Sequence, residues 1–343
     1  MFILPIYKKI DKKNKTIYCT VSSGYVADMQ KRKLGKSSAE ISVIGLGTWA
    51  IGGPWQFGWG EQNDEESKQA VIKSIEKGVN YIDTAPAYGL GHAEKIVGEA
   101  LKEIKEEVFI ATKCGLVWDD KGRIRRHNKP ESIRKECEDS LKRLSVDAID
   151  LYQIHWPDPE TPVEESWQEM TKLKEEGKVK HIGVSNYDAN MIKECEKISH
   201  VDSSQPPFSL LKRDIETEIL GLCHKNETAT LAYSPMQAGL LSGSFTKEKL
   251  DSLQKDDWRR KDAFFKEPLF GQIMKKMVIF KKLAEEKNTT AGALALAWVL
   301  SKEGVTSAIV GARNENQAAE NTRAAEIKIS VQEQEYIQNI FDM

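Results

Sequence analysis

Three ionisable residues stand at the carboxyl ends of short apolar runs that have the length of buried strands. Asp83 ends the run YID, Lys113 ends VFIATK, and His155 ends IDLYQIH. Burying an isolated charge costs several kcal/mol in practice, so a buried strand seldom ends on a charge without a partner. Tyr88 follows Asp83 in a proline-containing loop. Taken singly, each charge can be a residue that merely meets solvent, and a lone loop tyrosine is usually an amphipathic surface residue.

Together, these four side chains would make a general acid aimed at a carbonyl group. A phenol has an ordinary pKa of about 10 and is a poor acid at neutral pH. A Lys113 ammonium beside Tyr88 would favour the phenolate and lower that pKa, and Asp83 would keep Lys113 charged and oriented. His155 could donate a hydrogen bond to a substrate oxygen. A positioned acid of this kind is what hydride reduction requires, so we expect Asp83, Tyr88, Lys113 and His155 to be the catalytic residues.

Short apolar runs alternate with helix-like stretches from Met29 onward. The strand-like runs are 43–46, 81–83, 108–112, 149–154, 181–184, 202–204, 230–233 and 308–310. The helix-like stretches are 65–77, 93–103, 130–144, 162–175, 189–198, 215–225 and 291–302, with a further amphipathic stretch after residue 310. Strict alternation favours a parallel sheet, and no Pro-, Gly- or Ser-rich linker divides the eight steps into halves. We therefore expect one (β/α)8 TIM barrel over residues 29–343, which would bring the strand-end charges to one rim.

Three segments lie outside the eight steps. Residues 33–42 read as a hairpin that could cover the bottom of the barrel, and residues 241–290 form a long insertion after the seventh strand. Long loops after barrel strands lie on the functional face, so the insertion, which contains the run DWRR at 257–260, is a candidate lid. Residues 1–28 place an apolar patch before a run of lysines, the reverse of a signal peptide, and we expect an N-terminal extension outside the fold.

Composition excludes several other classes of protein. The 343 residues include 50 Lys and Arg against 52 Asp and Glu, and the net charge of −2 gives no general attraction to nucleic acid or acidic membranes. No run of 18 or more apolar residues exists to span a membrane. The five cysteines are widely spaced and include no CxxC pair, which indicates a reducing compartment with neither a disulfide framework nor a zinc site. We expect a cytoplasmic protein without a metal site.

Two stretches could bind a dinucleotide. The run GLGTWA at 45–50 matches the Rossmann fingerprint, but that motif needs a helix to begin there, and the breaker-rich IGGPW follows instead. The better candidate is Gly311-Ala312-Arg313-Asn314 after the eighth strand, because the next helix would offer unpaired N–H groups to a phosphate. The alternative is that Asn314 or Asn316 simply caps that helix.

The ordered motifs resemble those of the aldo-keto reductase superfamily from Met29 to about Asn321. The matching runs are IGLGTW at 44–49, NYIDTA at 80–85 with Tyr88-Gly89, ATK at 111–113, LYQIH at 151–155, IGVSN at 182–186 and GARN at 311–314. The four residues that this family uses in catalysis fall on Asp83, Tyr88, Lys113 and His155. The resemblance implies reduction of aldehydes or ketones to alcohols by hydride transfer from NADPH, with Tyr88 as the general acid.

The resemblance also implies a set of cofactor contacts. They are Gly47, Thr48 and Trp49 after the first strand; Ser185, Asn186 and Gln205 at the nicotinamide carboxamide; Tyr233 on the nicotinamide ring; Ser234, Pro235, Gly239, Leu240 and Ser242 around the pyrophosphate; and Gly311, Arg313, Gln317 and Asn321 at the adenosine. Arg313 would pair with the 2′-phosphate, which favours NADP(H), with NAD(H) as a second possibility. Two positions depart from the family pattern: Ser244 stands where a lysine is frequent, and Phe208 where a tyrosine is frequent.

Three tryptophans near the predicted rim suggest the kind of substrate, and two other functions fit parts of the same sequence. Trp49, Trp118 and Trp156 lie in or beside rim loops and would form an aromatic pocket for small or aromatic carbonyl compounds, although each could instead be a core residue. One rival is a non-catalytic, cofactor-binding barrel of the potassium-channel β-subunit type, which retains the same four residues. The other is an unrelated barrel enzyme, such as a phosphate-binding isomerase or a metal-dependent hydrolase. A metal site needs clustered ligands at strand ends, and among the histidines only His155 stands at such a position.

Overall fold

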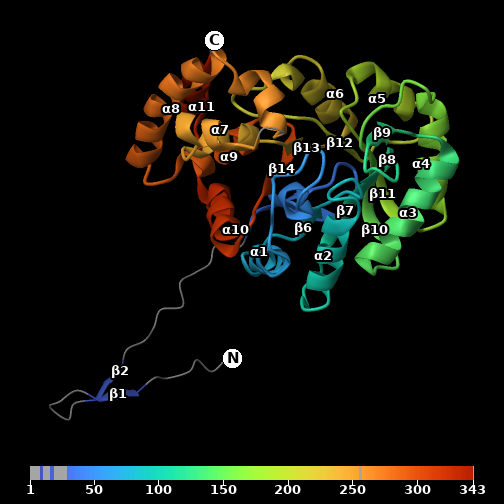
Figure 1. The fold of residues 1–343 in the computed structure, drawn as a ribbon, viewed down its shortest axis with the longest axis horizontal. Helices are drawn as coiled ribbons and strands as arrows, with labels where there is room; N and C mark the ends of the chain where they lie inside the picture. Colours follow the sequence, from blue (N-terminus) through green and yellow to red (C-terminus); the bar gives the residue numbers. More distant parts are fainter. Residues whose placement is uncertain (1–7, 11–15, 19–28, 255–256, 343) are drawn as a thin grey trace.

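A closed barrel of eight parallel strands forms the centre of the molecule (Figure 1). The computed structural model describes residues 8–10, 16–18, 29–254 and 257–342. The barrel strands are β5 (Ile44–Gly47), β6 (Tyr81–Asp83), β7 (Phe109–Cys114), β10 (Ile149–Ile154), β11 (Val179–Ser185), β12 (Ser203–Gln205), β13 (Ala229–Tyr233) and β14 (Val305–Gly311). They pair in this order, and β14 closes the circle against β5. The predicted TIM barrel is confirmed, strand by strand.

Helices follow the strands and cover the outside of the barrel (Figure 1). They are α1 (Asp64–Glu76), α2 (His92–Leu101), α3 (Pro130–Leu144), α4 (Val163–Glu175), α5 (Ala189–Glu196), α6 (Ile219–Asn226), α9 (Ala291–Ser301) and α10 (Glu315–Thr322). Several begin at residues whose side chains accept a hydrogen bond from a first-turn N–H, including Asn63, Asp188, Thr290 and Asn314. These caps set where the loops end and so fix the rim from which the site is built.

A hairpin covers the amino-terminal end of the barrel, as predicted. Its strands are β3 (Lys31–Lys33) and β4 (Glu40–Ser42), and its fully buried Leu34 and Ile41 pack in one cluster with barrel-interior residues that include Tyr81 and Leu231. A Cβ at Gly35 in the turn would lie 2.3 Å from the carbonyl oxygen of Glu227, just before β13 begins. This end of the barrel is therefore filled by packed side chains.

Gly45 on β5 leaves room for the ring of Tyr81, which lies two residues before Asp83 on β6. A Cβ at position 45 would come within 2.4 Å of that ring, which is fully buried in the close-packed interior of the barrel. Gly45→Ala is expected to destabilise the fold by about 1–3 kcal/mol through overpacking. Urea unfolding followed by circular dichroism measures this loss of stability.

Gly221→Ala is the matched control for this prediction. Gly221 is exposed within α6, and a Cβ there meets nothing within 4 Å, so alanine should leave stability unchanged or raise it slightly. Equal unfolding midpoints for the two alanine variants would show that the Tyr81 ring can yield, contrary to the expectation.

Some elements lie outside the predicted pattern. A hairpin of β8 (Leu116–Trp118) and β9 (Ile124–Arg126) follows β7, and α11 (Val331–Phe341) ends the chain. Much of the 241–290 insertion is the helix α8 (Leu269–Glu286), which packs on α9 and α11, with ring centroids of Phe280 and Phe341 5.3 Å apart. The part of the insertion before α8, with α7 (Lys247–Ser252), is the part to which the lid prediction still applies.

The prediction for residues 1–28 falls largely outside the described residues. Within that segment β1 (Lys8–Ile10) and β2 (Thr16–Tyr18) form an antiparallel pair. That the segment stands apart from the barrel therefore stays a prediction. Among the described residues, no helix is both long and apolar enough to cross a membrane.

Candidate active site

The four predicted catalytic residues meet at the carboxyl ends of β6, β7 and β10. Asp83 is the last residue of β6, Lys113 lies one residue before the end of β7, and His155 directly follows β10. Tyr88 lies in the loop between β6 and α2, where Gly89 packs so closely on Gly52 that a Cβ would lie 2.0 Å from the Gly52 carbonyl oxygen. That contact holds the Tyr88 loop against the rim, and the ring of Tyr88 lies 5.7 Å, centroid to centroid, from the imidazole of His155.

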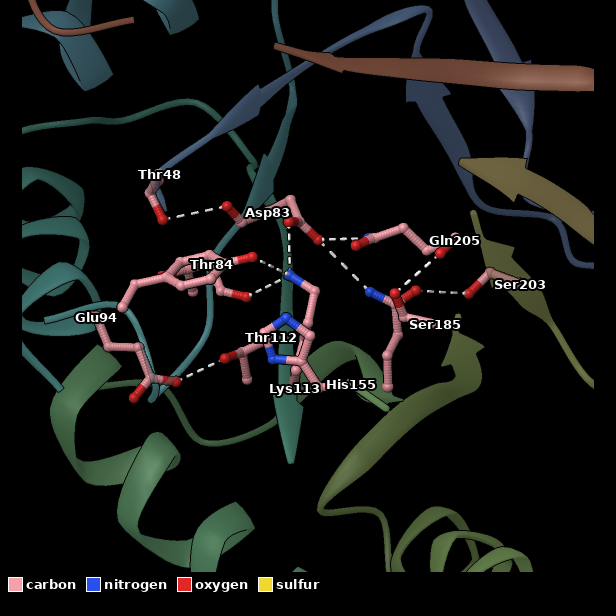
Figure 2. A network of polar contacts seen from close by, with 12 residues as sticks. Thr48, Asp83, Thr84, Glu94, Thr112, Lys113, His155, Ser185, Ser203 and Gln205 are labelled. Atoms are coloured by element: carbon pink, nitrogen blue, oxygen red, sulfur yellow. Dashed lines mark hydrogen bonds and ion pairs between the residues drawn. The ribbon is translucent and has the colours of Figure 1, made fainter. Parts of the chain in front are cut away.

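The ammonium of Lys113 is at the centre of the site. It donates to Asp83 Oδ1 at 2.6 Å and to the carbonyl oxygen of Thr84 at 2.9 Å (Figure 2). It also donates to the hydroxyl of Tyr88 at 3.2 Å. The Lys113 side chain is 0% exposed and that of Asp83 is 3% exposed. An ammonium has three donors, so all of them are used and the position of the charge is fixed.

The second oxygen of Asp83 is held by amides from the neighbouring strands. Gln205 Nε2 donates to Asp83 Oδ2 at 2.8 Å (Figure 2). Gln153 Nε2 lies 3.5 Å from the same oxygen. Ser203 in turn donates to Gln153 Oε1 at 3.2 Å. Thr48 donates its hydroxyl to the backbone oxygen of Asp83 at 3.1 Å. Gln153 and Thr84 were not predicted, although Gln153 stands two residues before His155 and so faces the same side of the strand.

Burial and charge together set the acidity of these groups. Burial lowers the pKa of Lys113, but the charge of Asp83 and the contacts with Asp83 and Tyr88 outweigh it, so the net pKa is raised. Burial raises the pKa of Tyr88 by more than Lys113 lowers it, so the net pKa lies above 10. Lys113 lowers this pKa, as predicted, but burial, which the prediction left out, keeps the net pKa raised. Burial, and then Lys113, hold the pKa of His155 well below 6.5, so this imidazole is neutral at pH 7.

A second buried network anchors the wall behind the site. Glu94 on α2 is fully buried and accepts from Thr112 Oγ1 at 2.6 Å and from Arg143 Nε at 2.5 Å. Thr112 precedes Lys113 on β7, and Figure 2 shows Glu94 reaching it from the neighbouring helix. This network ties α2 and α3 to the strand that carries Lys113.

The residues predicted at the nicotinamide carboxamide lie together at the ends of β11 and β12, beside Tyr233, which is predicted on the nicotinamide ring and ends β13. The hydroxyl of Tyr233 donates to Asn186 Oδ1 at 2.8 Å, and Asn186 Nδ2 donates to the His155 carbonyl oxygen at 2.9 Å. Ser185 Oγ donates to the Gln205 carbonyl oxygen at 2.9 Å. Because Gln205 Nε2 is held by Asp83, its Oε1, which accepts no hydrogen bond within the described residues, is left for an amide N–H. These side chains fit a carboxamide group.

The turn after β13 has the backbone of an anion site. Left-handed φ angles occur at Ser234, Gln237, Ala238 and Gly239, within and just before the short helix η3 (Gln237–Ser242). Turns of this kind can point successive N–H groups into one concavity, which suits the predicted pyrophosphate. Ser242 Oγ donates to the Gly239 carbonyl oxygen at 2.7 Å. Of the other predicted residues here, Pro235 and Leu240 are buried, and the divergent Ser244 is exposed.

The residues predicted at the adenosine end surround the start of α10. Asn314 caps this helix by accepting from the N–H of Gln317 at 3.0 Å, so the capping alternative is correct. Gly311 is exposed nearby, so capping by Asn314 leaves the backbone at Gly311 open to a ligand. Asn321 Nδ2 donates to the Gly311 carbonyl oxygen at 3.1 Å, and the N–H of Arg313 donates to Gln317 Oε1 at 2.9 Å. The last residue of β5, Gly47, pairs with Gly311 across the closing strands.

Tryptophans form one wall beside Tyr88, but they are only partly those predicted. Trp49 stacks near the ring of Tyr88, with centroids 6.4 Å apart, and on Trp258 at 5.2 Å. Trp55 lies 6.3 Å from Tyr88, and Trp59 meets Trp49 edge-on at 5.9 Å. The pre-helical part of the insertion thus reaches this wall through Trp258.

The other two predicted tryptophans lie on the β8–β9 side of the rim. Trp118 pairs with Ile124 in the β8–β9 hairpin. The ring of Trp156 lies 4.9 Å from the guanidinium of Arg126, the last residue of β9. The structure therefore brings Trp49 to Tyr88 and shows no ring contact between Tyr88 and either Trp118 or Trp156 among the described residues.

Comparison with known proteins agrees with this geometry. The family model described as "Aldo/keto reductase family" matches residues 43–342. Aldo-keto reductase YhdN of Bacillus subtilis is 37% identical over 84% of this chain and 86% of its own length. The NADH-specific methylglyoxal reductase of Escherichia coli is 35% identical over 88% of this chain and 95% of its own. A solved glycerol dehydrogenase from Gluconobacter oxydans is 38% identical, with a TM-score of 0.83 over 90% of this chain and 94% of that chain. This chain belongs to the aldo/keto reductase family, and it is an oxidoreductase by that membership.

Proposed function

We propose that this protein reduces aldehydes and ketones to alcohols with NADPH, and that Tyr88 is the general acid. The observation that carries the proposal is the single buried ammonium of Lys113, which contacts Asp83, Thr84 and the hydroxyl of Tyr88 at once. An acid whose conjugate base forms beside a fixed positive charge is suited to protonate a carbonyl oxygen.

Each residue has a separate task in this proposal. When bound, the reduced nicotinamide supplies the hydride that the carbonyl carbon accepts. Tyr88 gives its proton to the carbonyl oxygen, and Lys113 stabilises the phenolate that this leaves. Asp83 keeps Lys113 charged, and neutral His155 can donate a hydrogen bond to the oxygen without adding a charge. Solvent then returns a proton to Tyr88.

The substrate class is small carbonyl compounds with an apolar or aromatic face. Trp49 supplies an aromatic surface beside Tyr88, and Trp55 and Trp258 extend it. The Escherichia coli relative is named for methylglyoxal and the Gluconobacter structure for glycerol, both three-carbon compounds. Methylglyoxal and glyceraldehyde therefore belong in a test panel beside benzaldehyde and simple ketones.

The test is a turnover assay with the purified protein. NADPH is mixed with each carbonyl compound, and loss of the absorbance of the reduced nicotinamide is followed. Absence of NADPH binding would overturn the proposal. Binding without reduction of any carbonyl would favour the non-catalytic barrel of the potassium-channel β-subunit type instead.

Arg313 is the residue on which the preference for NADP(H) rests. Arg313→Ala is expected to weaken NADPH binding by about tenfold to a hundredfold, because hydrogen bonds to a charged group are among the strong ones. NADH has no 2′-phosphate, so its dissociation constant should stay within about twofold. Quenching of tryptophan fluorescence by each coenzyme gives both constants. An equal loss for the two coenzymes would contradict the 2′-phosphate assignment.

A cytoplasmic location is part of the same proposal. Cys114, Cys137, Cys195 and Cys223 are all free and buried, which supports a reducing compartment.

A further inference from the structure

The side chain of Arg313 is held by the loop that precedes α1. Its Nε donates to Gln62 Oε1 at 2.6 Å, and its Nη2 donates to the Glu61 carbonyl oxygen at 2.6 Å. Gln62 Nε2 donates back to the Arg313 carbonyl oxygen at 2.9 Å. Two residues 251 positions apart are thus joined by reciprocal hydrogen bonds, which fix the orientation of both side chains.

Gln62 is itself anchored at the start of a helix. The next residue, Asn63, caps α1 by accepting from the N–H of Glu66 at 3.0 Å. Helix α1 lies beside α10, whose own cap residue, Asn314, directly follows Arg313 (Figure 1). The Gln62–Arg313 pair therefore bridges two neighbouring capped helices. Each partner directly precedes a helix cap, which fixes the position of its backbone.

The geometry leaves one side of the guanidinium available for a ligand. A guanidinium has five N–H donors, and here Nε and one N–H of Nη2 are used. The remaining donors have no partner within the described part of the chain, and they can converge on one anionic group. Because Gln62 and the Glu61 carbonyl group are neutral acceptors, they orient the guanidinium without cancelling its charge. An arginine ordered before the ligand arrives loses less side-chain freedom on binding.

We propose that Gln62 is a specificity-determining positioning residue, which holds Arg313 in place for the 2′-phosphate of the coenzyme. This rests on the proposed pairing of Arg313 with that phosphate. The chemical class recognised is a phosphate monoester on the adenosine ribose. Gln62 contributes to the choice between NADPH and NADH without touching the reacting atoms.

The test compares dissociation constants of NADPH and NADH by tryptophan fluorescence for six proteins. They are the wild type, Gln62→Ala, Gln62→Glu, Arg313→Ala, the double variant Gln62→Ala/Arg313→Ala and the control Gln69→Ala. Gln69 lies on α1 and its amide donates to Glu65, away from Arg313, so this control should bind both coenzymes as the wild type does. Thermal unfolding of each variant reports whether α1 remains intact.

Gln62→Ala is expected to raise the NADPH dissociation constant about fivefold, roughly the effect of one hydrogen bond, and to leave the NADH constant within about twofold. In the Arg313→Ala background the same change should have no further effect, because the two residues act through one group. Gln62→Glu keeps the acceptor but places a carboxylate beside the phosphate, so it should weaken NADPH by more than Gln62→Ala does.

The outcomes separate this inference from the function on which it rests. If Arg313→Ala is selective for NADPH and Gln62→Ala is not, the role of Gln62 is refuted while the 2′-phosphate assignment stands. Tighter NADPH binding by Gln62→Ala would also refute it, since Gln62 would then be a competitor for Arg313. A further loss in the double variant would mean that Gln62 acts by another route. If Arg313→Ala affects both coenzymes equally, the underlying assignment fails first.

Discussion

Tyr88→Phe is expected to lower the turnover number for carbonyl reduction by about 10²–10⁴-fold, the usual contribution of a positioned general acid. The phenylalanine ring keeps the packing against Trp49 but has no proton to give. NADPH affinity should stay within about twofold, because Tyr88 is not among the predicted cofactor contacts and its ring is retained. Steady-state kinetics with a reducible aldehyde, together with fluorescence titration of NADPH, measure the two quantities separately.

Tyr336→Phe is the control for this substitution. Tyr336 is 55% exposed on α11, and loss of its hydroxyl should change neither quantity. If Tyr88→Phe kept most of the wild-type turnover, another group would have to be the proton donor. The pH profile gives a second check. Reduction needs the protonated phenol, and burial holds the pKa of Tyr88 above its ordinary value, so the rate should hold through neutral pH and fall only in alkaline solution.

Asp83→Asn is expected to destabilise the fold by about 3–5 kcal/mol, because it leaves the ammonium of Lys113 buried without its counter-charge. The charge of Asp83 is a principal cause that raises the pKa of Lys113 against burial, so that pKa should fall in the variant. Activity should fall with it, since a neutral Lys113 stabilises a phenolate poorly. Urea unfolding at pH 7 measures the stability.

Two further variants test the cause of that loss. Asp139→Asn removes the partner of Lys135, a helix pair in which the lysine is 76% exposed, and should cost less than about 1 kcal/mol. Combining Asp83→Asn with Lys113→Met should recover much of the stability, because no isolated charge then remains buried. A loss for Asp83→Asn as small as that for Asp139→Asn would show that solvent reaches the pair.

The barrel could be predicted because its strands are short apolar runs separated by loops and helix-like segments. The bounds of β6, β10 and α3 in the structure are those that the pattern predicts. The start of β14 was missed because Thr306 and Ser307 are polar. Both are buried, and Ser307 Oγ donates to the Ser42 carbonyl oxygen at 2.9 Å, a long-range partner that no local pattern shows.

The sequence of α8 contains a helical pattern of apolar residues, although the whole of 241–290 is interpreted from the sequence as an insertion and candidate lid. Its buried residues Phe270, Ile273, Met277, Phe280 and Ala284 recur at three- and four-residue spacing. This pattern predicts an amphipathic helix packed on its neighbours, as the structure shows. The lid prediction relied instead on the general rule that long loops after barrel strands are functional.

Some residues of the candidate site could likewise be predicted from the sequence, and others could not. Asp83, Lys113 and His155 were visible because charges seldom end buried strands, and parallel strands bring their carboxyl ends together. Thr84 contributes a backbone oxygen, which no side-chain pattern can reveal. The places of Trp55 and Trp258 depend on how two distant loops pack on each other. The net acidity of Tyr88 depends on its burial, which becomes known only with the fold.

The hairpin of β3 and β4 closes one end of the barrel, so stability and chemistry depend on opposite ends. Leu34 and Ile41 fill the closed end with apolar packing, while the reactive groups and the tryptophan wall stand at the other. Changes in the rim segments 53–63 and 257–265 can therefore alter which molecules are accepted with little effect on how the closed end folds. Such an arrangement lets substrate range diverge quickly among descendants of one barrel, and it makes those two segments the natural place to exchange sequence when redirecting the enzyme.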